Sequence, residues 1–495
     1  MTAISRRSFL KYTGGGLAAA GPLGMLAART AGAAPPPAAG GYGPLVPKGD
    51  LALPAAFNYQ VVDRQATPMR DGRPTPGIFD GMGAFPDTGG GVHGNGDRTV
   101  LIRNHENRER AGEIKVVTGP GLEYDESCAG GNTKVVVERE KAGRDPVGQQ
   151  LYRYTVVDRF AIIGGTSTNC AGGELPFKKW VTCEEVVKRQ PNGKKHGYIF
   201  EIDAMADGPV AAIPVPQAGR LAHEATTWRA GILYETEDRT LNAAQGGACL
   251  YRYIPDQRVG QSGNLAETTG PLQALAIRGM PRMNMDAVVT PGASFPVTWV
   301  PVPEPDHNDD TDMRKDRQPG FTPTRYQAQD NGAAIFDRQE GMWASSQGGG
   351  FKVYFDCTFG GPQNLGQVWE YDPGRELLTL IYVSTSVETM ENPDNITIVP
   401  QTHDIFLCED SPGDQFIRGV TQDGEIYNFA QALTNGTEFC GACFSPNGKT
   451  LFVNQQGDRG VDESGQPTTG VDPAVTYAIY GPFQKRAGAN NNSGL

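Results

Sequence analysis

Metal-ligand side chains recur in this chain where short strand-like runs begin and end. The run Trp180-Val181-Thr182 stops on Cys183, Glu184 and Glu185, and other runs stop on Asp, Glu or Asn. Roughly fourteen to sixteen residues before several of these ends, another polar residue opens a strand. The pairs are Asn169 with Cys183, Glu224 with Glu237, Glu340 with Asp356, Asn395 with Glu409, and Glu438 with Asn454. A hairpin of two short strands would bring each start beside the next end.

A ring of such residues around one opening would hold cations, because carboxylate and amide oxygens bind hard ions and thiolates bind softer ones. Taken singly, each Asp or Glu is better interpreted as a solvated turn residue. Recurrence at strand ends favours the metal site for the set. Cys183 stands out because two carboxylates follow it, and both a metal-bound thiolate and a buried thiol fit that position. Cys170 fits either a small buried side chain or half of a disulfide.

The elements that must position these residues form a repeat. After most of the polar ends comes a second, aromatic strand, and these strands begin near residues 151, 198, 250, 368, 426 and 477. A step of about fifty residues is typical of a four-stranded propeller blade. High Gly and Pro content and few helix-period segments support an all-β fold. We predict a single β-propeller of six blades, or seven if the long gap holds one, with a loop-rich insertion at 255–335. Residues 57–63 are expected to close the ring.

The N-terminus indicates export. Arg6 and Arg7 precede a weakly apolar Gly/Ala stretch and a small-residue cleavage site at Ala31-Gly32-Ala33, as in a twin-arginine signal. The predicted organisation is a signal peptide at 1–33, a linker or N-terminal arm at 34–56, a propeller domain at 57–486 and a disordered tail at 487–495. The lack of another long apolar run argues against stable membrane insertion. The net charge of −12 argues against nucleic acid as a partner.

Several longer motifs occur in order across most of residues 100–456. The most specific are Asn169-Cys170-Ala171-Gly172-Gly173 and Thr182-Cys183-Glu184-Glu185. Others are Gly219-Arg220-Leu221-Ala222-His223-Glu224, Arg338-Gln339-Glu340-Gly341, Pro393-Asp394-Asn395, Leu407-Cys408-Glu409-Asp410 and Glu438-Phe439. Together they resemble the PhoX-type alkaline phosphatase family. The chain departs from the family pattern at Cys440, where a small residue is usual.

The resemblance implies an exported, secreted or periplasmic propeller that hydrolyses phosphate monoesters for phosphate scavenging. It implies a cofactor of two Fe³⁺ and about three Ca²⁺ with a bridging oxide, so that a metal-bound oxide or hydroxide would be the nucleophile. Cys183 would be a ligand to iron. The oxygen ligands would come from Glu184, Glu185, Glu224, Glu340, Asn395 and Glu438. Arg338 would grip the phosphoryl group bidentately, with Asn169 as the other catalytic residue. The twin-arginine translocase would be a partner during export, and a monomer is expected.

Two rival interpretations use the same carboxylates. A calcium-dependent propeller lactonase or phytase would need neither iron nor Cys183. A non-catalytic exported propeller would bind calcium for stability only. Ferric iron bound to a thiolate absorbs visible light, so the colour of the purified protein would separate these alternatives from the iron enzyme. A histidine-rich zinc phosphatase does not fit, because the chain has only 6 His. His105 and His223 are expected to be structural hydrogen bonders.

Overall fold

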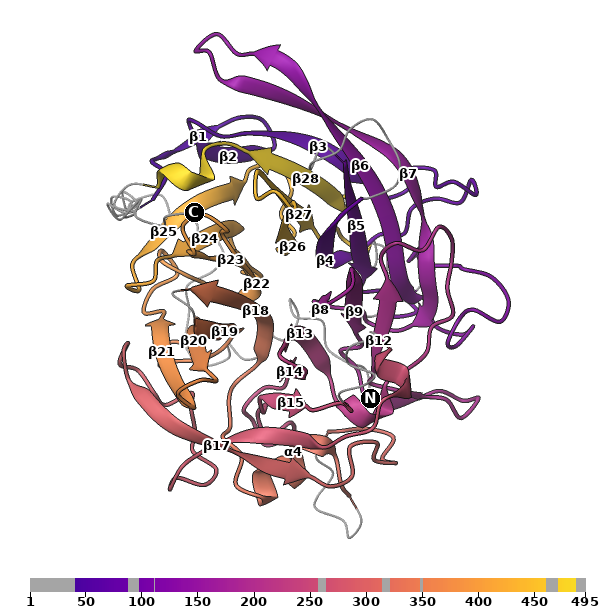
Figure 1. Ribbon diagram of the computed structural model, residues 1–495, viewed down its shortest axis with the longest axis vertical. Helices are drawn as coiled ribbons and strands as arrows, with labels where there is room; N and C mark the ends of the chain where they lie inside the picture. The colour runs from indigo at the N-terminus through magenta and orange to yellow at the C-terminus, as the bar shows by residue number, and fades with distance from the viewer. Residues whose placement is uncertain are drawn as a thin grey trace, which may run out of the picture.

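The computed structural model describes residues 41–87, 98–110, 112–256, 264–313, 321–347, 350–459 and 471–486. Within these residues, the regular secondary structure is almost all antiparallel strand, and the strands meander outward from a common centre (Figure 1). The all-β propeller predicted from the sequence is therefore confirmed. The predicted signal peptide at 1–33 and tail at 487–495 lie outside the described residues.

The N-terminal half of the chain supplies three meanders. The first contains β4 (Phe79–Pro86), β5 (Arg98–His105), β6 (Gly130–Arg144) and β7 (Gln150–Thr166). The second contains β8 (Gly173–Leu175), β9 (Lys179–Cys183) and β12 (Ile199–Asp203), with a separate hairpin of β10 (Lys188–Arg189) and β11 (Lys195–His196). The third contains β13 (His223–Arg229), β14 (Ile232–Glu237), β15 (Tyr251–Tyr253) and β16 (Leu272–Ile277).

The C-terminal half supplies the remaining meanders of the described chain. The fourth contains β18 (Gln339–Gln347), β19 (Gly350–Cys357), β20 (Gln367–Asp372) and β21 (Leu377–Val383). The fifth contains β22 (Pro393–Ile398), β23 (Ile405–Glu409), β24 (Phe416–Val420) and β25 (Ile426–Ala432). The sixth contains β26 (Phe439–Phe444), β27 (Thr450–Gln455), β28 (Val475–Tyr480) and β3 (Asn58–Arg64).

The first strand named for each meander lies innermost. In the sixth meander, the outermost strand, β3, comes from the N-terminal side of the chain. β4 contacts β8 and β26, β13 contacts β8 and β18, and β22 contacts β18 and β26, so these strands close a ring. Their labels surround the centre of Figure 1. This is the arrangement that a propeller requires of its innermost strands, and the count of six blades stays a prediction.

Both ends of the described chain join the ring. β3 pairs antiparallel with β28, which places Asn58 opposite Tyr480. The predicted closing strand at 57–63 is thus confirmed. In the segment predicted as a linker or arm, β2 (Leu51–Pro54) pairs with β25, and β1 (Leu45–Pro47) pairs with β2. The fifth meander therefore gains two outer strands from the N-terminal arm.

The segment 255–335 is only partly an insertion. β16 pairs with β15 as the fourth strand of the third meander, so the expectation that this whole segment lies outside the repeat is wrong. The sequence of β16 is apolar except for Gln273, and its other residues are buried. The rest of the segment forms β17 (Ser294–Val302), which bridges β16 and β21, and α4 (Thr324–Asp330). This bridge makes one nine-stranded sheet of the third and fourth meanders.

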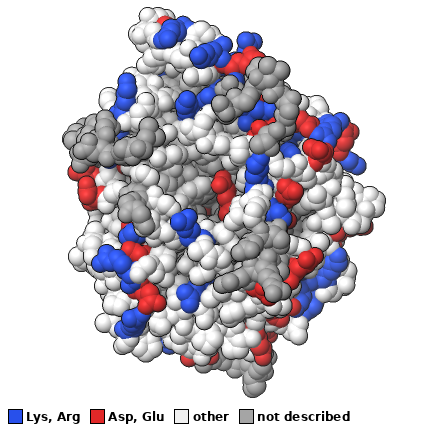
Figure 2. Space-filling model, in the orientation of Figure 1, with Lys and Arg blue, Asp and Glu red and all other residues white. Residues whose placement is uncertain are grey.

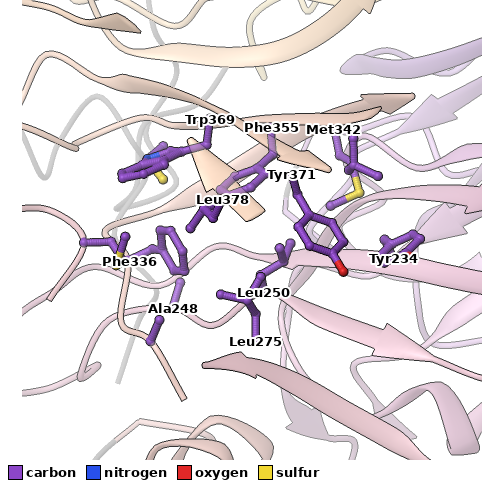
Figure 3. Packing of buried hydrophobic residues seen from close by; sticks show 14 of the residues in the cluster. Tyr234, Ala248, Leu250, Leu275, Phe336, Met342, Phe355, Trp369, Tyr371 and Leu378 are labelled. Atoms are coloured by element: carbon purple, nitrogen blue, oxygen red, sulfur yellow. The ribbon is translucent and has the colours of Figure 1, made fainter. Parts of the chain in front are cut away.

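The largest apolar cluster lies between these two joined meanders. Figure 3 shows Phe336, Phe355 and Trp369 grouped together. The ring of Phe336 meets those of Phe355 and Trp369 edge-on, with centroids 5.6 and 5.9 Å apart. Such contacts between neighbouring meanders fix the angle between them, because well-packed aromatic rings resist sliding.

Lys and Arg side chains are interspersed with Asp and Glu over the face shown in Figure 2, without a large patch of one sign among the described residues. Nucleic-acid binding would call for a basic stripe, which this face does not present. Within the described part of the chain, no helix has the length and apolar character needed to cross a membrane.

Neighbouring inner strands approach one another closely where they begin. A Cβ atom added to Gly81 would lie 1.8 Å from the carbonyl oxygen of Ala171, and one on Gly341 would lie 2.6 Å from that of Asp394. On Gly441, which has a φ of +59°, it would lie 2.3 Å from the carbonyl oxygen of Asp80. Only glycine fits these positions, and it allows the starts of neighbouring inner strands to lie close together around the centre of the ring.

We expect Gly81→Ala to destabilise the protein strongly, because its methyl group would meet backbone atoms that cannot rotate away. The free energy of unfolding should fall by at least about 3 kcal/mol, the upper end of overpacking costs. Urea unfolding measures the change. The matched control is Gly208→Ala, where an added Cβ meets no atom within 4 Å. Equal stability of the two variants would contradict close approach of β4 to the second meander.

Candidate metal centre

The starts of the inner strands are irregular at equivalent places. Register shifts occur in β4 between Phe79 and Met82, in β13 between His223 and Thr226, and in β18 between Gln339 and Met342. β22 and β26 contain similar shifts near their first residues. A bulge adds one residue to a strand and redirects the side chains beside it. Here the redirected residues include Asp80, Glu224 and Glu340.

The redirected side chains gather with others into three overlapping groups. Within each group, the potential ligand atoms all lie within 4.8 Å of one another. The groups are Asp80, Glu106 and Cys170; Cys170, Glu185 and Glu224; and Glu224, Glu340 and Asp394. Cys170 and Glu224 each belong to two groups, so the groups form one continuous series. We call these seven residues the donor arc.

Hydrogen bonds fix Cys170 at the junction of two groups. The Asn104 side chain on β5 donates to the backbone carbonyls of Cys170 and Ala171, and Trp180 Nε1–H donates to Asn104 Oδ1 at 2.9 Å. The Cys170 thiol contacts Glu185 Oε2 at 3.0 Å. The next residue also joins the second and third meanders, because the Ala171 amide lies 3.4 Å from Glu224 Oε2.

The donor arc carries many negative charges. Burial, together with the charges of Glu185, Glu224, Glu106 and Asp80, raises the pKa of the Cys170 thiol well above its usual range. Bringing so many like charges into a buried site is unfavourable unless cations join them. The arrangement therefore suits bound metal ions, which would stabilise the carboxylates and the thiolate together.

Three arginines lie along the arc. Arg459 donates to Glu106 Oε2 at 2.9 Å, and Arg108 pairs with both Glu106 and Glu185. Arg338 pairs with Glu340 and Asp238, and its guanidinium packs 4.7 Å from the centre of the Phe359 ring. Arg338 also has a positive φ of 53°, at the turn that leads into β18. Planar guanidinium groups beside an anionic site can bind phosphate oxygens bidentately.

Five of the predicted site residues lie in or beside the donor arc. Glu185, Glu224 and Glu340 belong to it. Glu438 adjoins it, because the side-chain amide of Gln456 donates to Glu438 Oε1 at 2.8 Å and to Glu106 Oε2 at 2.9 Å. Arg338 flanks the arc at Glu340, as described above. These residues lie near the starts of the inner strands, and their role as metal ligands stays a prediction.

Cys183 has different surroundings from those expected of an iron ligand. It is fully buried in an apolar cluster with Val181, Ile199 and Leu233, and among the described residues it belongs to none of the metal-ligand groups. Its pKa is raised well above the usual range of a thiol, mainly by burial and to a lesser extent by the charges of Glu235 and Glu224. Cys183 thus has the environment of a packed thiol.

Three further predicted residues have hydrogen-bond partners within the protein. Asn169 donates to Thr182 at 2.9 Å and accepts from Thr166 at 2.7 Å. The Asn395 side-chain oxygen accepts the backbone N–H of Gly441 at 2.9 Å. Glu184 accepts from the backbone N–H groups of Ser167 and Gly197, and pairs with the imidazole of His196 at 2.7 Å. Although burial opposes ionisation, His196 and the backbone N–H groups of Gly197 and Tyr198 lower the pKa of Glu184.

Sequence reasoning missed four members of the donor arc: Asp80, Glu106, Cys170 and Asp394. A signal for most of the inner-strand members exists in the sequence. A ligand-type residue is followed directly by a small one in Asp80-Gly81, Cys170-Ala171, Glu224-Ala225 and Glu340-Gly341. The small residue permits close approach of the next strand, and the residue before it faces the arc.

The two histidines near the arc have structural roles. The ring nitrogens of His105 lie 2.9 Å from the Gly77 carbonyl and 2.9 Å from Thr133 Oγ1. Burial and the neighbouring Arg103 lower the pKa of His105 to about 3. His223 lies 3.1 Å from the Gly219 carbonyl and 3.1 Å from Glu235 Oε2. These contacts agree with the prediction that both are hydrogen bonders.

A cavity of about 520 Å³ lies at the other ends of the inner strands. It is lined mainly by apolar residues, including Phe85, Leu175, Trp343 and Ile398. Glu174 and Lys178 are its charged lining residues, so it lacks the clustered donors found at the strand starts. The chemistry of the described residues is therefore concentrated at one end of the ring.

Comparisons with known proteins agree with this architecture. The family model described as alkaline phosphatase PhoX matches residues 40–458. Pseudomonas fluorescens PhoX, in complex with vanadate, a transition state analogue, is 16% identical with a TM-score of 0.63, over 91% of this chain and 99% of that chain. Trypanosoma rangeli sialidase in complex with the inhibitor DANA is 10% identical with a TM-score of 0.32. That match covers 68% of this chain and 43% of the sialidase chain. None of the curated proteins matches the chain.

Proposed function

Because the chain belongs to the alkaline phosphatase PhoX family, we propose that it hydrolyses phosphate monoesters with metal ions bound at the donor arc. Membership of this family identifies the chain as a phosphoric-ester hydrolase. The preference for monoesters, the metals and the physiological role in phosphate scavenging are parts of our proposal.

The observation that carries the proposal is the continuity of the three metal-ligand groups. Cys170 connects the first group to the second, and Glu224 connects the second to the third. Adjacent cations held in this way could contact two oxygens of one phosphoryl group, which a single isolated site could not do. Phosphoryl transfer depends mainly on such positioning and on charge stabilisation.

The donor set fits the metals that the family resemblance implies. A thiol and several carboxylates can hold Fe³⁺, and the remaining carboxylates suit Ca²⁺, which takes oxygen ligands almost exclusively. We assign the iron-binding thiolate to Cys170 instead of Cys183, because only Cys170 lies among the carboxylates. Two Fe³⁺ and about three Ca²⁺ remain our proposed complement. When bound, these cations would supply positive charge for the phosphoryl oxygens and would lower the pKa of an attacking water.

The protein's own side chains would orient the ester. Arg338 is held between Asp238 and Glu340, so its planar group is fixed beside the arc before substrate arrives. Arg108 and Arg459 are fixed in the same way by Glu106. We propose that these guanidinium groups bind phosphoryl oxygens and that Asn169 is a positioning residue, because its amide ties Thr166 to Thr182 beside Cys170.

We further propose export by the twin-arginine route to the periplasm or the exterior. The support is the Arg6-Arg7 pair and the small-residue cleavage site in the first 33 residues. This route carries folded proteins, so metal ions could be bound before translocation. The working enzyme is proposed to be a monomer with small phosphate esters as substrates.

Metal removal provides the test. The purified full-length protein should hydrolyse p-nitrophenyl phosphate, and exhaustive chelation of calcium should abolish the activity because the carboxylates would repel one another and the substrate. Added Ca²⁺ should restore part of it. Phytate and lactone substrates, assayed in parallel, test the rival enzyme classes. Monoesterase activity that survives complete chelation would contradict the metal mechanism.

A further inference from the structure

A fourth group of metal-ligand side chains lies apart from the donor arc. Asp125 and Cys128 belong to the segment between β5 and β6, and His196 ends β11 in the β10–β11 hairpin. Their ligand atoms lie within 4.8 Å of one another, and all three side chains are buried, with at most 1% of their surfaces exposed. Nothing in the proposed phosphatase mechanism uses them.

The distances within this group match the edges of a tetrahedral metal site. His196 Nε2 lies 3.5 Å from Cys128 Sγ and 3.5 Å from Asp125 Oδ2. Bonds to zinc of about 2.3 Å for sulfur and about 2.0 Å for nitrogen and oxygen, at tetrahedral angles, separate the ligand atoms by roughly 3.3–3.6 Å. In contrast, hydrogen bonds from nitrogen to oxygen are typically about 2.7–3.2 Å long. The separation of His196 Nε2 from Asp125 Oδ2 is thus long for a hydrogen bond, whereas 3.5 Å is ordinary for one from nitrogen to sulfur. Both separations fit two ligands of one ion.

Neighbouring side chains orient each member of the group. His196 Nδ1 lies 2.7 Å from Glu184 Oε1, so that Nδ1–H can donate to the carboxylate and leave the lone pair on Nε2. A carboxylate behind a histidine in this way is the usual support of a metal-binding imidazole. Ser127 Oγ donates to Asp125 Oδ1 at 2.7 Å, and Gln190 donates to Cys128 Sγ at 3.0 Å.

We propose that Asp125, Cys128 and His196 bind one transition-metal ion of the zinc class, separate from the ions at the donor arc. Thiolate and imidazole ligands favour Zn²⁺ over Ca²⁺ or Mg²⁺, which take oxygen ligands. Three protein ligands leave the fourth position of the tetrahedron to water. The rival explanation is a cluster of buried polar groups that bind no metal.

The bound ion would fasten two loops that border the donor arc. Asp125 and Cys128 lie on the segment that begins with Glu106, and His196 is tied through Glu184 to the neighbouring Glu185. Glu106 and Glu185 belong to different groups of the arc and share Arg108. The metal would therefore fix Glu106 and Glu185 relative to each other without touching either of them, which is a positioning role.

Cobalt binding tests the proposal. The full-length wild-type protein, stripped of metal and titrated with Co²⁺, should show a thiolate-to-cobalt charge-transfer band with the intense visible bands of tetrahedral cobalt. Cys128→Ser should lose these bands. Glu184→Gln, which removes only the carboxylate behind His196, should weaken cobalt binding about 10- to 100-fold. If Cys128→Ser retains the bands of the wild type, the proposal is overturned.

The matched control is Cys170→Ser, which removes a buried thiol from the donor arc. This variant should keep the tetrahedral cobalt bands. If the bands disappear in Cys170→Ser and persist in Cys128→Ser, the metal belongs to the arc and the proposed site does not exist.

A second measurement requires no substitution. X-ray absorption of the zinc-loaded wild type should find one sulfur at about 2.3 Å and nitrogen or oxygen at about 2.0 Å from the metal. A zinc shell without sulfur would overturn the proposal even if Cys128→Ser fails to fold.

Discussion

Cys170→Ser should lower phosphomonoesterase activity by at least about a hundredfold, the scale on which lost metal or charge stabilisation is measured. Cys170 is the only thiol of the donor arc and connects two of its groups. A serine hydroxyl resists deprotonation, so the variant should also lose iron and the visible absorption of a ferric thiolate. Steady-state kinetics, iron analysis and the absorption spectrum measure the three effects.

Cys183→Ser is the control for this substitution. Both cysteines are fully buried, and the backbone N–H of Cys170 donates to the Cys183 carbonyl at 3.1 Å. Each change therefore removes one sulfur from the same part of the fold. Cys183→Ser should reduce stability, because a hydroxyl enters an apolar cluster, but should keep its iron. Loss of iron from Cys183→Ser alone would restore the assignment predicted from the sequence.

Glu224→Gln should reduce activity by about a hundred- to a thousandfold, comparable to the loss of a main electrostatic contributor at an active site. Glu224 is the only carboxylate shared by two groups of the arc. An amide at this position removes a negative charge that both groups need to hold cations. Metal analysis should therefore show losses greater than one ion per chain.

Glu185→Gln is the comparison, because Glu185 belongs to one group only and also pairs with Arg108. It should lose less metal and less activity than Glu224→Gln. Circular dichroism of both variants checks that the propeller is intact. If the two variants lose equal amounts of metal, the groups are independent sites and the arc is not continuous.

The fold was predictable because each meander repeats the same local pattern. Strand-like runs that end on polar residues correspond to β9, β14, β19, β23 and β27, and the aromatic strands near 198, 250, 368, 426 and 477 correspond to β12, β15, β20, β25 and β28. The predicted closing strand is β3. β16 was missed because the sequence shows no aromatic strand start between those near 250 and 368, so the spacing of the repeat gave no guide there.

The site was less predictable because bulges change which side chain faces the arc. In β22, Asn395 lies opposite Cys408, and the register shifts between Pro393 and Asn395. An unbulged hairpin would direct Asn395 to the centre, whereas the bulge gives that place to Asp394. A shift of one residue reverses the face of every side chain in a strand.

The pairing of β3 with β28 has a consequence for biosynthesis. The ribosome makes β3 before almost all of the propeller, and its partner β28 is the last described strand. The sixth meander therefore cannot be completed during most of translation, and until then β3 is an edge strand able to pair with other chains. Contacts of such long sequence separation also form slowly. A nascent or truncated chain would have an open ring, so tight metal loading must follow release from the ribosome.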